Sequence, residues 1–420
     1  MQKKLFADSE KIAEIAAVYP TPFHLYDEAG IRRNAQNLRA AFAWNPNFRE
    51  YYAVKACPNP HILKILRECG CGVDCASIPE MMLAQAAGMR GDEIIFSSNE
   101  TSAEEYVYAR KIGAIINLDD ITHIDFLAEN GGLPEKICLR YNPGGELFCG
   151  DNCMGHPEES KYGMTRPQIL EAARILSRRG VKRFGVHALL ASNALDPAYY
   201  TQNAELLFEL ARELRDVCGV EIFMVNLSGG LGIPYAPDEA APDVFAVGEA
   251  IRASFARILA SDGIGVCAEL GRWMTGPCGC LVTRAIHFKH TYREYVGVDA
   301  CAADLMRPAM YGAYHHITVC GKENAPSDRV YDVVGSLCEN NDKFAVQRSL
   351  PEIEIGDLLV IHDTGAHGYS MGYNYNGRLR HAEILLRPDG TFTQIRRAET
   401  PADYFATLDF PPLNGILREN

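Results

Sequence analysis

One lysine stands among apolar neighbours in the N-terminal half of the chain. Lys55 lies in the segment Tyr-Tyr-Ala-Val-Lys-Ala-Cys, whose aromatic and β-branched residues predict a strand that ends near the lysine. Lysine side chains are rarely buried without a partner. The amine is therefore either half of a structural ion pair or a functional group, because desolvation lowers the pKa of an amine and makes it nucleophilic toward aldehydes. Both alternatives are open on this segment alone.

Two other motifs could complete a site around such an amine. Gly229, Gly230 and Gly232 share one loop, and glycines let backbone N–H groups approach a phosphate closely. Glu269, in the Ala-Glu-Leu-Gly-Arg segment that ends at Arg272, could hold a protonated ring nitrogen. Taken singly, the loop could only turn the chain and the acid could be a surface ion-pair partner. An amine, a phosphate loop and an acid together are what pyridoxal phosphate requires.

The C-terminal half contains three further polar segments. Arg307 and Tyr311 stand near a bend fixed by proline, and arginine suits bidentate recognition of a carboxylate. Cys338 lies beside Glu339 in a loop bounded by glycine. Tyr375 belongs to a loop rich in tyrosine and asparagine. Each segment taken singly also fits a turn or a packing role.

From about residue 30 to 270, apolar strand-like runs alternate regularly with helical patterns. Apolar runs predict eight strands, at 51–56, 72–77, 94–98, 114–119, 137–142, 184–190, 222–227 and 266–270. Helical patterns are clear at 31–42, 60–69, 79–87, 103–112, 166–179, 200–218 and 244–260. Eight regular units predict an α/β fold, a (β/α)8 TIM barrel, whose active sites lie at the carboxyl ends of the strands. An open doubly wound sheet is the alternative.

A second, mainly β domain is predicted after the barrel, as a Greek-key-like barrel or sandwich. Strand patterns occur at 279–288, 295–300, 316–320, 330–334, 357–362 and 381–387, and helical periodicity nearly vanishes. The segment 22–26 could pair into the same domain. The expected division is therefore 28–272 for the cofactor-binding barrel, and 1–27 with 273–420 for the β domain.

Composition excludes several classes of function. The 420 residues carry a formal net charge of −13, which disfavours nucleic-acid binding. No apolar run suggests a membrane span or a signal peptide, so a cytoplasmic protein is expected. The 14 cysteines are expected to be mostly buried hydrophobes or catalytic thiols. Cys149, Cys153 and His156 share a polar loop, but no fourth ligand is evident, and no metal site is predicted.

Taken together, the motifs resemble those of the diaminopimelate decarboxylases, members of the alanine-racemase-like, fold type III class of pyridoxal-phosphate enzymes. The likeness covers nearly the whole chain. Its markers are Tyr-Ala-Val-Lys at Lys55, Gly-Val-Asp at 72–74, the glycine loop, Glu-Leu-Gly-Arg at 269–272, Arg-Pro-Ala-Met-Tyr at 307–311, Cys-Glu at 338–339 and Tyr-Asn at 375–376. The resemblance implies pyridoxal-phosphate-dependent conversion of meso-2,6-diaminopimelate to L-lysine and CO2.

The resemblance also implies a role for each marker. Lys55 would hold the cofactor as a Schiff base, and Glu269 would pair with its pyridine nitrogen. The other cofactor-binding residues would be Asp74, Ser192, Gly229, Gly230, Gly232, Gly271, Arg272 and Tyr375. The substrate-binding residues would be Arg272, Arg307, Tyr311, Glu339 and Tyr375, with Glu339 taking the distal ammonium. Cys338 would donate a proton to the product. Cys338 and Glu339 would come from a partner subunit, which implies a homodimer.

Several residues depart from the family pattern. Leu189 stands where the family has a histidine stacked on the cofactor ring, and Ala191 replaces a glycine. His187, two residues before Leu189, could compensate. Leu270 replaces a proline, and His367 replaces a tyrosine. These changes leave open a related decarboxylase acting on carboxynorspermidine, ornithine or arginine, and a non-catalytic homologue.

Overall fold

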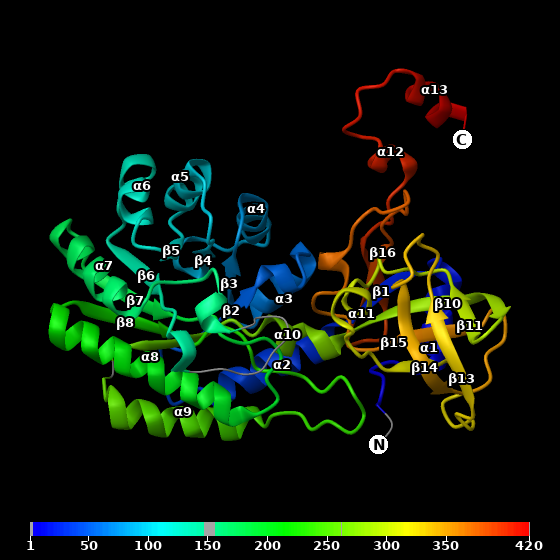
Figure 1. Cartoon of the computed structure of the whole chain (residues 1–420), viewed down its shortest axis with the longest axis horizontal. Helices are drawn as coiled ribbons and strands as arrows, with labels where there is room; N and C mark the ends of the chain where they lie inside the picture. The colour runs from blue at the N-terminus through cyan, green and yellow to red at the C-terminus, as the bar shows by residue number, and fades with distance from the viewer. Residues whose placement is uncertain (1–2, 147–155, 262, 420) are drawn as a thin grey trace. The chain divides into compact units, whose positions relative to one another are not determined.

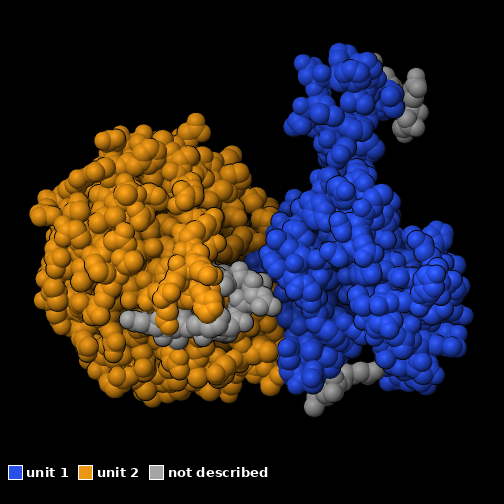
Figure 2. All heavy atoms as spheres, in the orientation of Figure 1, with its two compact units in different colours: residues 1–30, 235–239, 276–420 blue, residues 31–234, 240–275 orange. Residues whose placement is uncertain are grey.

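A computed structural model describes residues 3–146, 156–261 and 263–419, which divide into two compact units. Unit 1 comprises residues 1–30, 235–239 and 276–420, and unit 2 comprises residues 31–234 and 240–275 (Figure 2). In the described residues, no helix is long and apolar enough to cross a membrane.

Unit 2 is a closed barrel of eight parallel strands, which confirms the predicted fold (Figure 1). The strands are β2 (Arg49–Ala53), β3 (Gly72–Cys75), β4 (Ile94–Ser97), β5 (Ile115–Leu118), β6 (Lys136–Arg140), β7 (Arg183–His187), β8 (Glu221–Asn226) and β9 (Gly265–Ala268). Each pairs with the next along the chain, and β2 pairs with β9 to close the circle. Closure follows from eight similar strand–helix repeats, because every strand then finds two neighbours and no edge remains exposed.

Helices separate the strands of the barrel. They are α2 (Glu28–Ala41), α3 (Pro60–Glu68), α4 (Ile78–Ala86), α5 (Ala103–Ile112), α6 (His123–Asn130), α7 (Arg166–Arg178), α8 (Pro197–Cys218) and α9 (Val244–Ile258). Several begin at polar caps; Ser102, for example, caps α5 in a reciprocal capping box with Glu105. The sequence analysis missed α6, whose eight residues span only about two turns.

The barrel strands end earlier than predicted at their carboxyl ends. The first predicted strand extends to residue 56, but pairing stops at Ala53, and a 3-10 turn, η1 (Val54–Ala56), follows. Likewise β7 ends at His187 rather than at residue 190. Apolar residues beyond a strand look like strand residues in a sequence, yet here they belong to the loops at the mouth of the barrel.

Unit 1 is a nine-stranded β structure. Its strands are β1 (Phe23–Asp27), β10 (Gly279–His290), β11 (Glu294–Val298), β12 (Ile317–Val319), β13 (Arg329–Val334), β14 (Lys343–Leu350), β15 (Leu358–Ile361), β16 (Ala382–Leu386) and β17 (Phe392–Arg396). The main order is β14-β13-β11-β10-β1-β16-β17, with β15 on β10 and β12 on β15. The N-terminal β1 pairs with both β10 and β16, so this unit uses both ends of the chain.

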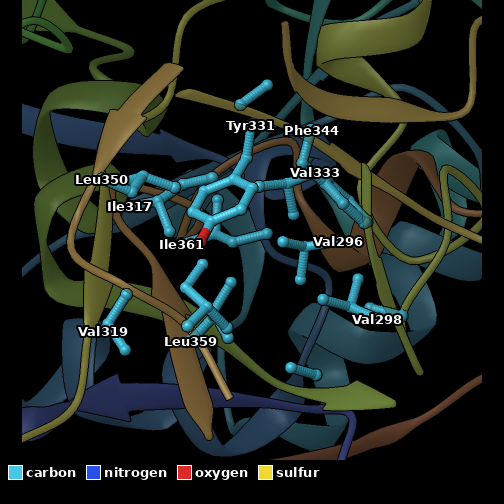
Figure 3. Close-up of a cluster of buried hydrophobic side chains, with 14 of the residues drawn as sticks. Val296, Val298, Ile317, Val319, Tyr331, Val333, Phe344, Leu350, Leu359 and Ile361 are labelled. Atoms are coloured by element: carbon cyan, nitrogen blue, oxygen red, sulfur yellow. The ribbon is translucent and has the colours of Figure 1, made fainter. Parts of the chain in front are cut away.

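A buried apolar cluster fills one part of unit 1 (Figure 3). Tyr331, Val333 and Phe344 come from β13 and β14, and their side chains meet Leu359 and Ile361 of β15. The sequence analysis missed β14 and β17. Both pair with register shifts, and these interrupt the alternation of buried and exposed residues that marks a strand. It also missed α1 (Ser9–Val18), α12 (Pro401–Tyr404) and α13 (Pro412–Glu419).

Candidate active site

Each barrel strand carries a polar residue at or near its carboxyl end. From β2 to β9 these residues are Lys55, Asp74, Ser97, Asp119, Arg140, His187, Asn226 and Glu269. Because all strands are parallel, these eight positions lie at the same mouth of the barrel. The sequence analysis selected only Lys55, Asp74 and Glu269 for primary roles. The other five residues could have been selected from the sequence, because a polar residue stands at the end of each apolar run.

Glu269 follows β9 and is only 6% exposed. Its Oε1 accepts a hydrogen bond from Asn226 Nδ2 at 2.7 Å, and its Oε2 accepts one from Ser228 Oγ at 3.2 Å. His187 Nε2 lies 3.3 Å from the same Oε2. Burial alone would raise the pKa of this carboxyl, but the electrostatic effect and hydrogen bond of His187, the hydrogen bond of Asn226 and the charge of Arg140 hold that pKa below its usual range. Glu269 is therefore an ionised carboxylate in a buried position.

His187 connects Glu269 to a buried ion pair. Arg140 Nε donates to His187 Nδ1 at 3.2 Å, and Arg140 Nη1 donates to Asp119 Oδ1 at 2.7 Å. Because arginine only donates, Nδ1 must be the unprotonated nitrogen, and Nε2 then carries the hydrogen that Glu269 accepts. Burial lowers the pKa of His187, consistent with a neutral ring. His187 therefore orients Glu269 by donating a hydrogen bond.

Lys55 lies on the turn η1, and its side chain is exposed. The predicted strand at 51–56 would have placed Lys55 among apolar strand residues, but pairing stops at Ala53 and Lys55 lies on the turn that follows. The positive charge of Lys55 acts on two nearby carboxyls, Asp74 and Glu80. An exposed amine at the mouth of the barrel is accessible to an aldehyde.

Asp74 is the second acid near Lys55. It is 7% exposed, and burial together with the negative charge of Glu269 raises its pKa well above the usual range. Its Oδ1 has no hydrogen-bond partner within the described parts of the chain. An orphaned carboxyl oxygen at this mouth is a position where a polar group of a ligand could bind.

Glu50 is a further buried acid, on β2. Its Oε1 accepts the backbone N–H of Leu270 at 2.6 Å, and its Oε2 has no hydrogen-bond partner among the described residues. Burial, with a smaller effect from the charge of Glu269, raises the pKa of Glu50 to about 8. Leu270 stands where the family has a proline. A proline there could not donate a hydrogen bond to Glu50, because proline has no N–H.

The glycine loop follows β8 and depends on its glycines. A Cβ at Gly229 would lie 2.8 Å from the carbonyl oxygen of Glu269, and one at Gly232 would lie 2.8 Å from the carbonyl carbon of Asn193. Gly230 has a φ of +107°, which side chains rarely tolerate. The loop is thus pressed against neighbouring backbone, and a side chain at Gly229 or Gly232 would clash with it.

Ser192 and Arg272 meet at the same mouth. Arg272 Nη2 donates to Ser192 Oγ at 3.1 Å. Arg272 belongs to the short helix α10 (Gly271–Thr275), which packs on η1. A Cβ at Gly271 would lie 2.8 Å from that of Ala56, so this glycine permits the close approach of α10 to the turn that carries Lys55.

These barrel residues fit pyridoxal phosphate. The ionised Glu269 suits a protonated ring nitrogen, the glycine loop with Ser192 and Arg272 suits a phosphate, and Lys55 supplies an amine. The orphaned Oδ1 of Asp74 leaves room for a donor on the ligand or on Lys55. The individual roles remain predictions.

The other predicted residues lie in unit 1. Arg307 is buried and begins α11 (Arg307–Tyr311), whereas Tyr311 is 39% exposed. Cys338 and Glu339 are exposed in the loop between β13 and β14, and Tyr375 is 47% exposed in the loop before β16. These two loops are joined, because Cys338 N donates to the side chain of Asn376 at 2.7 Å. The sequence analysis gave Asn376 no role of its own.

The remaining departures from the family pattern lie around β7. Leu189 is half-buried and Ala191 is buried beside the glycine loop, where a Cβ at Gly230 would lie 3.4 Å from that of Ala191. Both nitrogens of His187 are bound, to Arg140 and to Glu269, and its role in place of the missing histidine stays a prediction.

Of the possible metal ligands, Cys149 and Cys153 lie outside the described residues, and His156 is exposed. Within the described ranges, no group of three or more histidine, cysteine or acidic residues could hold a metal ion.

Residues 28–276 match the family described as the pyridoxal-binding domain of pyridoxal-dependent decarboxylases. The chain belongs to this family. Its cofactor is therefore pyridoxal phosphate, and its reaction class is decarboxylation.

Several relatives resemble the chain over almost its whole length. Protein TabA of Pseudomonas amygdali pv. tabaci is 42% identical over 96% of this chain and 94% of its own. The diaminopimelate decarboxylase of Methanothermobacter thermautotrophicus is 36% identical over 95% of this chain and 94% of its own. A crystal structure of the M. jannaschii diaminopimelate decarboxylase in co-complex with L-lysine has a TM-score of 0.87 at 31% identity, covering 96% of this chain and 95% of that one.

Proposed function

We propose that the protein decarboxylates meso-2,6-diaminopimelate to L-lysine and CO2. The observation that carries the decarboxylase chemistry is Glu269, an ionised carboxylate held by three side-chain partners at the mouth of a barrel of this family. The substrate is supported by the relatives named diaminopimelate decarboxylase and by the L-lysine bound to one of them.

The residues of the barrel would bind and orient the cofactor. Lys55 would hold it covalently, and the glycine loop, Ser192, Arg272 and Tyr375 would bind its phosphate through N–H and O–H donors. When bound, pyridoxal phosphate supplies an electron sink for the pair of electrons left by the departing carboxylate. Glu269 would keep a proton on the ring nitrogen, because an ionised carboxylate stabilises a neighbouring cation.

The residues of unit 1, together with Arg272 of the barrel, would act on the substrate. Arg307, Tyr311 and Arg272 would bind the distal carboxylate, and Glu339 would bind the distal ammonium. Cys338 would give its proton to the carbon that has lost CO2. One carboxylate leaves as CO2 and one proton takes its place, so the reaction is balanced without an oxidant or a reductant.

Carbon dioxide release from candidate substrates tests this proposal. The purified holoenzyme is given meso-diaminopimelate, ornithine, arginine or carboxynorspermidine, with Lys55→Ala as the inactive control. We expect release from meso-diaminopimelate that Lys55→Ala abolishes. Release from one of the other amino acids would keep the reaction and reject the substrate. No release from any of them would reject the proposal.

A homodimer with shared active sites is a further part of the proposal. If Cys338 serves the partner's barrel, then Lys55→Ala and Cys338→Ala subunits can each repair the other's defect. Random mixing of the two inactive variants should restore about a quarter of wild-type activity, because half of the dimers would contain one intact site. A mixture that stays inactive, despite exchange of subunits shown by native mass spectrometry, would contradict the shared site.

A further inference from the structure

The guanidinium of Arg307 is held by two uncharged side chains of unit 1. Arg307 Nη1 donates to His315 Nε2 at 2.8 Å, and the guanidinium carbon lies 4.5 Å from the centre of the Tyr235 ring. The rings of Tyr235 and His315 also meet edge to face, with centroids 4.9 Å apart. All three residues are at least nine-tenths buried.

The protonation of His315 is fixed by the backbone. His315 Nδ1 lies 2.7 Å from the carbonyl oxygen of His362, which can only accept a hydrogen bond. Nδ1 therefore carries the hydrogen, and Nε2 presents a lone pair to Arg307. The guanidinium is thus oriented by a neutral imidazole that is itself anchored just beyond the end of β15.

Tyr235 reaches this arrangement from the connection that follows the glycine loop. The segment 235–239 belongs to unit 1, although the residues on both sides of it belong to the barrel unit. Glu239 accepts the backbone N–H groups of Tyr235 and Ala236 at 2.7 and 2.9 Å, which closes the segment into a turn. The Tyr235 ring is therefore held in place by its own turn as well as by its contact with His315.

Neither contact neutralises the positive charge of Arg307, which also acts on the carboxyl of Asp363. A hydrogen bond to a neutral imidazole and a π-face both fix the plane of a guanidinium and leave its charge intact. A guanidinium whose plane is fixed loses less entropy when it binds a planar carboxylate through two parallel hydrogen bonds.

We propose that Tyr235 and His315 are positioning residues that determine specificity, by orienting Arg307 for a carboxylate at the far end of the substrate. The inference rests on the proposed function only for the placement of Arg307 in the substrate pocket. It predicts that the enzyme distinguishes two amines that differ only in that carboxylate.

L-lysine and 1,5-diaminopentane form such a pair, because they differ by one carboxylate. Calorimetric titration of the holoenzyme measures the affinity of each without turnover. In Tyr235→Leu we expect L-lysine to bind about tenfold more weakly, while 1,5-diaminopentane binds as it does to wild type. Tyr235→Phe is the matched control, since it keeps the aromatic face and should retain L-lysine affinity. His315→Leu should behave as Tyr235→Leu does, and His315→Gln should restore part of the preference.

The possible outcomes separate this inference from the proposed function. Equal weakening of both ligands in Tyr235→Leu, or no weakening of either, would mean that Tyr235 is a packing residue only. A wild-type protein that binds L-lysine no better than 1,5-diaminopentane would overturn the inference whatever amino acid the enzyme decarboxylates. A clear preference for L-lysine without CO2 release from meso-diaminopimelate would leave the inference standing and reject the proposed substrate.

Discussion

Glu269 and Glu50 are two glutamates of one barrel with opposite protonation. Glu269 is 6% exposed and Glu50 is 4% exposed, so burial does not distinguish them. Three side-chain partners surround Glu269 and its pKa is lowered, whereas a single backbone N–H binds Glu50 and its pKa is raised to about 8. The donors around Glu269, together with the positive charge of Arg140, therefore decide which of the two buried acids carries a charge.

The difference also assigns the two residues to different tasks. An ionised acid in a buried position costs stability unless it is hydrogen-bonded, and it is useful where a cation must be held. Glu269 is hydrogen-bonded, and the cation that it is proposed to hold is the protonated ring nitrogen. Glu50 is close enough for its pKa to be raised by the charge of Glu269, and in its neutral form it adds no second negative charge to this end of the barrel.

Replacing Glu269 itself should have the largest effect. Glu269→Gln keeps the size of the side chain and removes its charge, so it no longer stabilises a protonated ring nitrogen. We expect kcat on the accepted substrate to fall by about 100-fold or more, with the cofactor still bound. Steady-state kinetics and the absorbance of the bound cofactor check this. A variant with full cofactor and wild-type kcat would remove Glu269 from the chemistry.

Removing one donor to Glu269 should have a smaller effect with a definite pH signature. His187→Leu deletes the Nε2 hydrogen bond, so the pKa of Glu269 should rise. Activity that needs the ionised carboxylate should then be lost at a higher pH as the solution is acidified, and kcat should fall about tenfold near neutrality. His187→Gln can still donate and is the matched control. An acid limb of kcat/KM that does not move in His187→Leu would show that the histidine does not tune Glu269.

Replacing Glu50 should change stability without changing activity. The pKa of Glu50 rises from 4.5 to about 8 on folding, so the folded state binds the proton more tightly than the unfolded state does. Its contribution to the free energy of unfolding is therefore full below pH 4.5 and is lost as the pH rises through about 8. Glu50→Gln keeps an acceptor for Leu270 N–H and cannot ionise.

The variant should thus match the wild type in acid, become progressively more stable than it as the pH rises from 4.5 to about 8, and keep a constant advantage at higher pH. Urea unfolding of both proteins across this range measures the difference. A difference that is constant with pH would mean that Glu50 does not titrate in this window.

The barrel is predictable from the sequence because its signals are local. Each strand is an apolar run bounded by a helix with its own pattern, and eight repeats leave few alternatives to closure. Lys55 and Glu269 could be found because each ends one of these runs. The exposure of Lys55 could not be predicted, because it depends on the residue at which strand pairing stops.

The hydrogen-bond chain from Asp119 through Arg140 and His187 to Glu269 could not be derived in the same way. Its members come from four strands and are up to 150 residues apart in the sequence, so only the closed barrel brings them together. The same holds for Tyr235 and His315 around Arg307, which meet only in the folded unit. In β14 and β17 the pattern itself is interrupted by register shifts.

Above all, Lys55 is proposed to hold pyridoxal phosphate at the mouth of the barrel. Reduction of the holoenzyme with sodium borohydride converts a lysine-bound pyridoxal group into a stable secondary amine, and peptide mass spectrometry then identifies the modified lysine. We expect a phosphopyridoxyl group on the peptide that contains Lys55. Modification of a different lysine, or of none in protein that still binds the cofactor, would contradict it.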